Sequence, residues 1–175
     1  MTTAAHPTDR WTVTQGDVTD PEAQRLLREY YDDVANRYYR LHLDRDGTPE
    51  ELDTGYADSP SNDLVAPTGV FLLGRYDGAA QSCAGLRVRD ETTVVLTRVF
   101  VRHALRGTGG GARLLAAVEE AARGLGAHRI VLDTRLDLVE ARALYSRHGY
   151  EEIPAFEAGP YAEVWYGKEL TPSGS

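Results

Sequence analysis

Four glycines lie within five positions in the segment Gly107-Thr108-Gly109-Gly110-Gly111, just ahead of an apolar run typical of a helix. Such a turn lets the backbone approach an anion closely and aims unpaired amide N–H groups at it, while the helix dipole adds positive potential. Three or four amides, at about 1.5 to 3 kcal/mol for each hydrogen bond to a charged group, would hold a diphosphate without a metal. The sequence therefore predicts a phosphate-binding turn from Gly107 to Ala112, with Arg106 as an added positive charge.

Two other interpretations of these glycines are open. Residues 107–112 also satisfy the G-x-G-x-x-A pattern of dinucleotide-binding turns, and Asp133 follows about 21 residues later at a predicted strand end. Against this, five residues separate Val101, the end of the preceding strand, from Gly107, whereas a dinucleotide fold runs that strand directly into its first glycine. A glycine turn that serves only tight packing is the other alternative. A P-loop is excluded because no Gly-Lys-Ser/Thr follows.

The turn needs a strand before it and a helix after it. Residues 92–101 (TTVVLTRVFV) are dense in β-branched side chains and predict a central strand. Residues 69–76 and 80–89, joined by Asp77-Gly78, predict an antiparallel hairpin ahead of that strand. After the turn, apolar residues at helical spacing predict a buried helix face made of Leu114, Leu115, Val118, Ala121, Ala122 and Leu125.

Start signals and periodicity place the remaining elements. Asp20-Pro21-Glu22 is typical of a helix start, and Thr48-Pro49-Glu50-Glu51 matches a capping box. The first helix is expected to pack one face inward, namely Leu27, Tyr30, Tyr31, Val34, Tyr38 and Leu41. The other predicted elements are a first strand (11–18), a strand (129–134), a helix (138–148) and two final strands (150–156 and 161–170).

This order predicts an α/β fold with a mixed, mostly antiparallel central sheet flanked by helices. The chain has 175 residues, of which 42% are hydrophobic, so we expect one domain over residues 1–175. Its ordered core should span about residues 11–170, because residues 1–10 and 171–175 are small and polar.

Composition excludes several classes of protein. A formal charge of -8 argues against a dedicated nucleic-acid binder. No apolar run is long enough to span a membrane and the first ten residues do not resemble a leader, so we expect a cytoplasmic protein without membrane partners. The single cysteine, Cys83, excludes an internal disulfide, and the five histidines lack metal-ligand spacing, so we expect no metal.

Two linked motifs resemble those of the GNAT superfamily of N-acetyltransferases. Arg106-Gly107-Thr108-Gly109-Gly110-Gly111 fits its R/Q-x-x-G-x-G/A signature. Ala141-Arg142-Ala143-Leu144-Tyr145-Ser146-Arg147-His148-Gly149-Tyr150 is similar to its A-x-x-L-Y-x-x-x-G-F/Y element, at the usual distance and with the expected strand between. The resemblance covers residues 69–170 well and the amino-terminal third only by the order of its elements.

The resemblance implies a GNAT-like acyltransferase fold and a donor, acetyl-CoA, in a cleft where two parallel strands splay apart. The pantetheine arm would then lie along Val99, Phe100 and Val101. The pyrophosphate would bind the amides of Gly107, Thr108, Gly109, Gly110, Gly111 and Ala112 beside Arg106. Tyr145 would protonate the departing thiolate, which is chemically sensible for a phenol of pKa about 10 and a thiol of pKa about 8.5.

The sequence departs from the superfamily pattern at two positions. Val95 occupies a strand position where many relatives carry a glutamate base, and Leu138 stands where relatives often place asparagine. An alkylamine of pKa about 10.4 must lose a proton before attack, at a cost of roughly 4 to 5 kcal/mol at neutral pH. Water or a carboxylate could accept that proton, and the candidate carboxylates are Glu29, Asp32, Asp33 and Glu163.

These observations predict direct transfer of acetyl from acetyl-CoA to a primary amine of a small molecule or peptide. A homodimer is a further expectation from the resemblance. Two alternatives from other classes stay open. One is a CoA-binding sensor or interaction module without catalysis, favoured by Val95 and Leu138, and the other is a dinucleotide-dependent oxidoreductase.

Overall fold

A computed structural model describes residues 7–172 of the chain. Seven strands form one sheet in the order β1-β2-β3-β4-β5-β7-β6. The elements are η1 (Pro7–Arg10), β1 (Trp11–Gln15), α1 (Pro21–Leu43), α2 (Pro49–Ala57), β2 (Gly69–Tyr76), β3 (Ala79–Val88), β4 (Thr93–Val101), η2 (His103–Leu105), α3 (Gly110–Gly124), β5 (Arg129–Thr134), α4 (Val139–Arg147), β6 (Glu151–Ile153) and β7 (Val164–Glu169).

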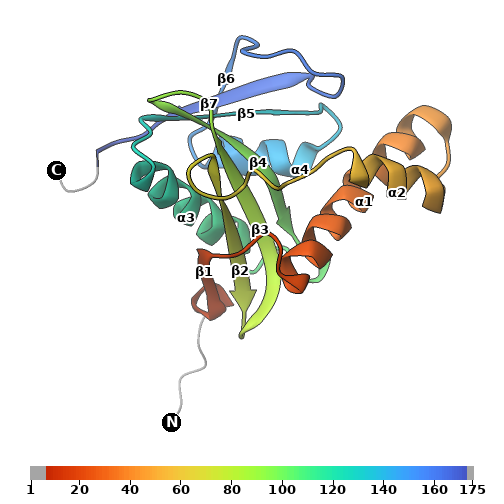
Figure 1. The fold of residues 1–175 in the computed structure, drawn as a ribbon, viewed down its shortest axis with the longest axis horizontal. Coiled ribbons are helices and arrows are strands. Elements are labelled where there is room, and N and C mark those ends of the chain that lie inside the picture. Colours follow the sequence, from red (N-terminus) through yellow and green to blue (C-terminus); the bar gives the residue numbers. More distant parts are fainter. Residues whose placement is uncertain (1–6, 173–175) are drawn as a thin grey trace.

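The strand pairing confirms the predicted mixed, mostly antiparallel sheet. Strands β1 to β4 form an antiparallel meander, and β5, β7 and β6 form a second antiparallel group. The two groups join only through the parallel pair β4–β5. Figure 1 shows α3 and the α1–α2 pair on opposite sides of these strands, so both faces of the sheet are covered.

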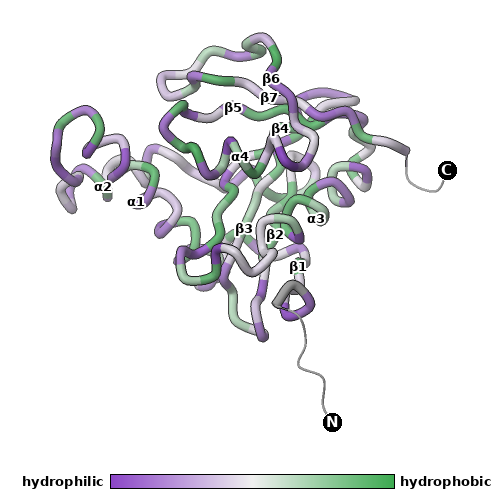
Figure 2. Tube along the Cα trace, turned by 180° about the vertical axis from the view of Figure 1, so that it is seen from behind, coloured by the Kyte–Doolittle hydropathy of each residue, from purple (hydrophilic) through white to green (hydrophobic). Residues whose placement is uncertain are grey.

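Side chains alternate between two hydrophobic clusters, one on each face. On β2, Val70 and Leu72 pack with α3 and α4, whereas Phe71 and Leu73 pack under α1. This is the period of two that a strand imposes when it is buried on both sides. Figure 2 shows the resulting hydrophobic stretches along the central strands and on α3, with hydrophilic residues spread over the outer helices.

Helix α1 begins as predicted, with Asp20 at the N-cap and Pro21 in the first turn, and α2 begins with the predicted capping box of Thr48 and Glu51. The expected inward face is only partly correct. Leu27 is buried, but Leu41 is 61% exposed, because the second half of α1 extends past the sheet. Tyr30 packs against the core cluster under α1 as predicted, whereas Tyr31 and Tyr38 line a cavity.

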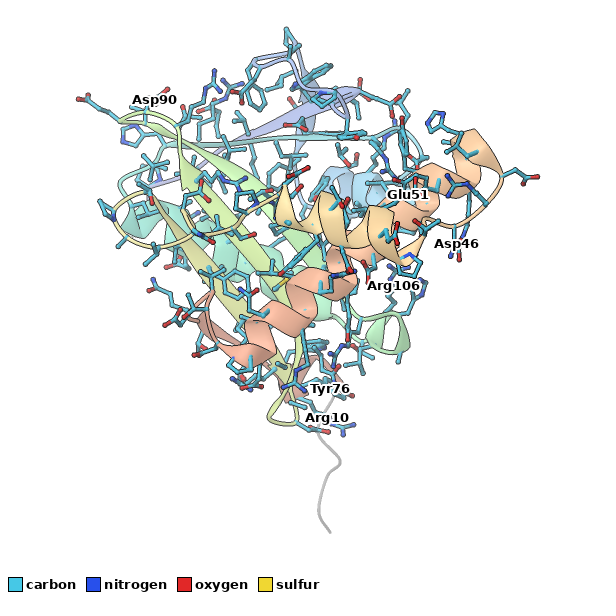
Figure 3. The ribbon with its side chains drawn as sticks, turned by 45° about the vertical axis from the view of Figure 1, so that its right-hand side comes forward. Arg10, Asp46, Glu51, Tyr76, Asp90 and Arg106 are labelled. Carbon is cyan, nitrogen blue, oxygen red and sulfur yellow. The ribbon has the colours of Figure 1, made fainter. Side chains whose placement is uncertain are left out.

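Three other expectations need correction. Leu125 is 37% exposed, since it follows the last turn of α3. The last two strands are shorter than predicted, because loop residues between them run outside the sheet. Residues Pro7–Arg10 form a short 3-10 helix instead of fraying, and Figure 3 shows Arg10 beside Tyr76, where its guanidinium lies 4.6 Å from the ring centre. The other residues expected to fray, 1–6 and 173–175, lie outside the described residues, and 171–172 form no helix or strand.

No helix within residues 7–172 has both the length and the apolar character needed to cross a membrane.

Candidate active site

The site begins where the two parallel strands separate. Pairing between β4 and β5 ends at Val95 and Val131, although β4 continues to Val101 and β5 to Thr134. Beyond that point the edge of β4 has no ladder partner on the β5 side. A strand edge of this kind offers backbone N–H and C=O groups to an extended ligand.

A β-bulge interrupts β4 at the same place. Cys83 pairs with Phe100 and Gly85 with Thr97, so Arg98 and Val99 together oppose Ala84. Arg98 adopts a left-handed conformation with φ of 58°, which is uncommon for a residue other than glycine. The bulge redirects the Arg98 side chain to the α1 side of the sheet, where it meets the loop before β2.

The glycine-rich turn has the conformation that its composition predicts. Gly107 and Gly109 have φ values of 81° and 87°, a region that costs other residues about 1–2 kcal/mol. Gly110 packs so closely that a Cβ would lie 2.5 Å from the Trp11 ring. The first amides of α3 have no intrahelical acceptor and therefore form an anion-binding helix start.

A cavity of about 600 Å³ lies between the separated strands, this turn and α4. It brings together nearly all the residues predicted to bind the donor, namely Val99, Phe100, Val101, Arg106, Gly107, Gly109, Gly110, Gly111 and Ala112. Thr108 is the exception. Its hydroxyl accepts a hydrogen bond from the Trp11 indole at 2.9 Å and donates one to the Leu105 carbonyl at 2.6 Å, so it holds the turn against β1.

We call this space the donor cavity, after the role that we propose for it. Arg106, labelled in Figure 3, Arg147 and His148 add basic side chains to the lining, and Glu140 lies on the same wall. A Cβ on Gly107 would meet no protein atom within 4 Å, so the glycine leaves open space beside the turn. Backbone amides, a dipole and basic side chains are the groups that bind CoA-type diphosphates.

Tyr145 lies on α4, lines the donor cavity and is 6% exposed. Its ring packs against Tyr150 and Tyr166, with centroid distances of 5.7 and 6.0 Å. Burial is the main cause of a raised pKa for Tyr145, and nearby Tyr30 and Asp133 add to it. The phenol therefore stays protonated throughout the physiological pH range and can donate a proton or a hydrogen bond there.

A second cavity, of about 710 Å³, adjoins the first on the α1 side. Its walls are rich in tyrosine, contributed by α1, α2 and the loop before β7: Tyr30, Tyr31, Tyr38, Tyr39, Tyr56 and Tyr161. Arg135 fixes α1 over this cavity, since it donates to the Val34 carbonyl at 2.8 Å. We call it the acceptor cavity, after the role that we propose for it; it shares lining residues with the donor cavity, Arg98 and Asp133 among them.

Asp133 is the carboxylate that lines both cavities. It lies on β5 two residues past the last pair with β4, so its side chain reaches the gap between the strands. No hydrogen bond or ion pair engages this carboxylate within the described part of the chain. Although it is accessible from the cavities, partial desolvation by the surrounding protein raises its pKa, and Glu157 adds a smaller repulsion.

The four carboxylates named as candidate bases are placed differently. Glu29 is held by Arg102 at 2.7 Å, and Asp32 by Arg28 at 2.9 Å. Glu163 accepts the Leu136 amide at 3.1 Å. None of these three lines either cavity, and Asp33 lines only the donor cavity. In the sequence, Asp133 stands out only as part of a dinucleotide pattern, although an acid at the carboxyl end of a buried strand is a usable signal of a site.

Val95 and Leu138, the two departures from the superfamily pattern, both line the acceptor cavity, and Leu138 lines the donor cavity as well. Cys83 lies outside both cavities under α1, and burial raises the pKa of its thiol to about 12. Within residues 7–172, no three His, Cys, Asp or Glu side chains are grouped so that they could hold a metal ion.

Together, the strand separation, the glycine-rich turn and the adjoining second cavity form one candidate site with two chambers. The chain belongs to the GNAT acetyltransferase family: the family profile described as "Acetyltransferase (GNAT) family" matches residues 22–150. The resemblance found from the two motifs is thereby confirmed.

Two curated relatives carry acetyltransferase names. An IAA acetyltransferase of Azospirillum brasilense is 31% identical over 99 residues, which cover 56% of this chain and 63% of that protein. The chain thus spans less than two thirds of this relative. An aminoglycoside N(6')-acetyltransferase type 1 of Stenotrophomonas maltophilia is 32% identical over 120 residues, 64% of this chain and 74% of that protein.

Solved structures share the fold over nearly the whole chain. A Klebsiella pneumoniae protein, provisionally described as an acyl-CoA N-acyltransferase, is 27% identical with a TM-score of 0.69, covering 92% of this chain and 98% of its own. A GNAT family acetyltransferase of Elizabethkingia anophelis with acetyl-CoA bound is 18% identical with a TM-score of 0.61, covering 93% and 99%.

Replacing Gly107 by Ala tests the turn. We expect the dissociation constant for CoA to rise about tenfold, because Ala disfavours the left-handed conformation by about 1–2 kcal/mol. Isothermal titration calorimetry measures this dissociation constant. Gly124→Ala is the matched control, since Gly124 lies at the far end of α3, the helix that follows the turn, with open space around it and no positive φ. Equal CoA affinity of the two variants would contradict the assignment.

Proposed function

We propose that this protein transfers the acetyl group of acetyl-CoA to a primary amine of a small molecule or peptide. The observation that carries the proposal is the junction of two cavities at Asp133: one cavity has a diphosphate-binding turn, and the other has tyrosine walls. An amine in the acceptor cavity would meet the thioester where the β4 and β5 strands separate.

The donor would bind with its diphosphate on the amides of residues 107–112 and near Arg106. Its pantetheine arm would run along Val99 to Val101, where the β4 edge is not paired with β5. An N–H group of that edge would then donate to the thioester oxygen as negative charge develops on it. This placement supports the predicted roles of these residues.

The amine must be neutral when it attacks. Asp133 would accept its proton directly or through one water molecule, because it faces both cavities and no basic side chain neutralises it. Its raised pKa makes it a better proton acceptor than a surface aspartate. Asp133 thus fills the role that the apolar side chain of Val95 cannot perform.

Tyr145 would donate a proton or a hydrogen bond to the departing thiolate in the donor cavity. The transfer would be direct, without an acetylated enzyme. Cys83, the single thiol, is buried outside both cavities and stays protonated because its pKa is raised to about 12. The amine therefore attacks the thioester carbon itself.

A thiol-release assay tests this function. Purified protein is incubated with acetyl-CoA and separate pools of amines, amino acids, aminoglycosides and peptides, and free CoA is measured against a reaction without acceptor. We expect acceptor-dependent CoA release and an acetylated amine with the mass of the acceptor plus one acetyl group. CoA binding by calorimetry without turnover on any pool would instead indicate the sensor, and NAD(P) binding in place of CoA would indicate the oxidoreductase.

A further inference from the structure

The charges of the acceptor cavity leave one arginine without a carboxylate. Three arginines line this cavity. Arg87 is paired with Asp63 at 2.6 Å, and Arg135 with Asp137 at 2.9 Å. Arg98 is different: among the residues that the structure describes, no carboxylate oxygen lies within 4.0 Å of its guanidinium.

Only neutral groups hold the Arg98 guanidinium. It donates to the Ser61 hydroxyl at 3.2 Å, the Thr97 hydroxyl at 3.2 Å and the Ser59 carbonyl at 3.3 Å. An arginine has five N–H donors, so two remain beyond these contacts. Arg98 is half-buried, and a charge in such a position is ordinarily neutralised by an opposite charge. Its backbone is also strained, with a positive φ at the bulge.

The groups around the Arg98 guanidinium indicate that it would contact the acceptor molecule and not the donor. Arg98 lines both cavities, but Ser59 and Ser61, which hold its guanidinium, line the acceptor cavity and are absent from the walls of the donor cavity. The guanidinium is therefore held on the acceptor side of the junction between the cavities. A ligand anion that reaches it belongs to the molecule in the acceptor cavity.

The acids that line the acceptor cavity differ in their partners and exposure. Glu157 is paired with Arg89 at 3.5 Å, and Asp58 is an exposed residue at the end of α2. Asp133 faces the reacting centre without a partner. The lining thus contains three acids and three arginines, a balance that does not favour an acceptor with several positive charges.

We propose that the acceptor is a small zwitterion, a primary amine whose carbon skeleton carries a carboxylate, as in a free amino acid. Its amino group would face Asp133 and its carboxylate would bind Arg98. The tyrosine walls would contact the rest of the molecule, since their rings are apolar and their hydroxyls can form hydrogen bonds. This inference rests on the proposed function and specifies its substrate class.

Matched acceptor pairs test the proposal in the full-length protein. Each pair consists of an amino acid and the amine that remains when its carboxylate is removed, such as phenylalanine with phenethylamine and leucine with isopentylamine. Initial rates of CoA release at saturating acetyl-CoA give kcat and KM for each acceptor. We expect kcat/KM of the preferred amino acid to exceed that of its decarboxylated partner and that of an aminoglycoside by at least about tenfold.

Arg98 variants then identify the carboxylate contact. In Arg98→Gln we expect KM for the amino acid to rise at least about tenfold while KM for its decarboxylated partner changes less than about threefold. Arg98→Lys should recover part of the loss, because it keeps the charge. Arg129→Lys is the control, since Arg129 lies outside both cavities and pairs with Glu169 at 3.1 Å.

The outcomes separate this inference from the proposed function. Turnover that favours plain amines or aminoglycosides, or an equal loss for both members of a pair in Arg98→Gln, overturns the zwitterion proposal and leaves the acetyltransferase intact. An absence of turnover with every acceptor overturns both. If circular dichroism and a lowered Tm show that Arg98→Gln has lost its fold, the pair preference of the wild type and the Arg98→Lys data decide.

Discussion

Replacing Asp133 by Asn is expected to lower kcat/KM for amine acetylation about 10²- to 10³-fold, the usual contribution of a positioned proton acceptor. Asn keeps the size of the side chain and removes its basicity. CoA affinity should change little, because the diphosphate turn lies at the other end of the donor cavity. Steady-state thiol release and CoA calorimetry measure the two quantities.

The pH profile gives this prediction a second readout. Asp133 works only when ionised, so below its pKa, which is raised above the ordinary value of about 3.9, wild-type kcat/KM should fall more steeply than protonation of the acceptor amine alone requires. The residual activity of Asp133→Asn should show only the shallower decline caused by protonation of the amine. A variant that retained the steeper decline would assign it to another group.

Stability is expected to change in the opposite direction from activity. Because its pKa is raised in the folded state, Asp133 stabilises the fold only when protonated, and this contribution is lost as the pH rises through the folded pKa. At neutral pH the ionised carboxylate is therefore destabilising. Asp133→Asn should have a Tm at pH 7 equal to or above that of the wild type, so unfolding cannot explain its loss of activity.

Asp32→Asn is the matched control for this experiment. Asp32 is one of the acids that the sequence offered as a base, but it is paired with Arg28 and lies outside both cavities. We expect its kcat/KM to stay within about threefold of the wild type, a change of less than about 1 kcal/mol. A comparable loss in both variants would argue against a specific role for Asp133.

Replacing Tyr145 by Phe is expected to lower kcat about 10²-fold, with little change in KM for acetyl-CoA. The ring contacts with Tyr150 and Tyr166 are retained, and only the hydroxyl of this donor-cavity residue is lost. The wild type should show no alkaline decline from Tyr145 up to about pH 10, because its pKa is raised above the ordinary tyrosine value of about 10.

The neighbouring Tyr150→Phe variant separates catalysis from packing. The Tyr150 hydroxyl is buried and, within the described residues, has no hydrogen-bond partner, and the residue does not line the donor cavity. Its removal should preserve activity and leave Tm unchanged or higher, since an unsatisfied buried polar group disappears. Full turnover in Tyr145→Phe would exclude the acid role.

The sequence predicted the parts of the molecule that depend on local chemistry. The left-handed glycines of the turn, the capping box at Thr48 and the alternating strands each follow from short-range preferences of the chain. The order of elements and the two motifs indicated the family, which the family profile confirms. The roles of Tyr145 and of the donor-binding residues stay predictions until the variants are measured.

Only the tertiary structure decided which side chains meet. The sequence predicts that the α1 tyrosines face the core, and Tyr30 packs against it, but Tyr31 and Tyr38 line a cavity because α1 extends beyond the sheet. Asp133 and Arg98 become prominent only after the separation of β4 from β5 and the bulge in β4 are known. Periodicity reports which face of an element is apolar, but a cavity forms where elements diverge, and that divergence depends on contacts between residues far apart in the chain.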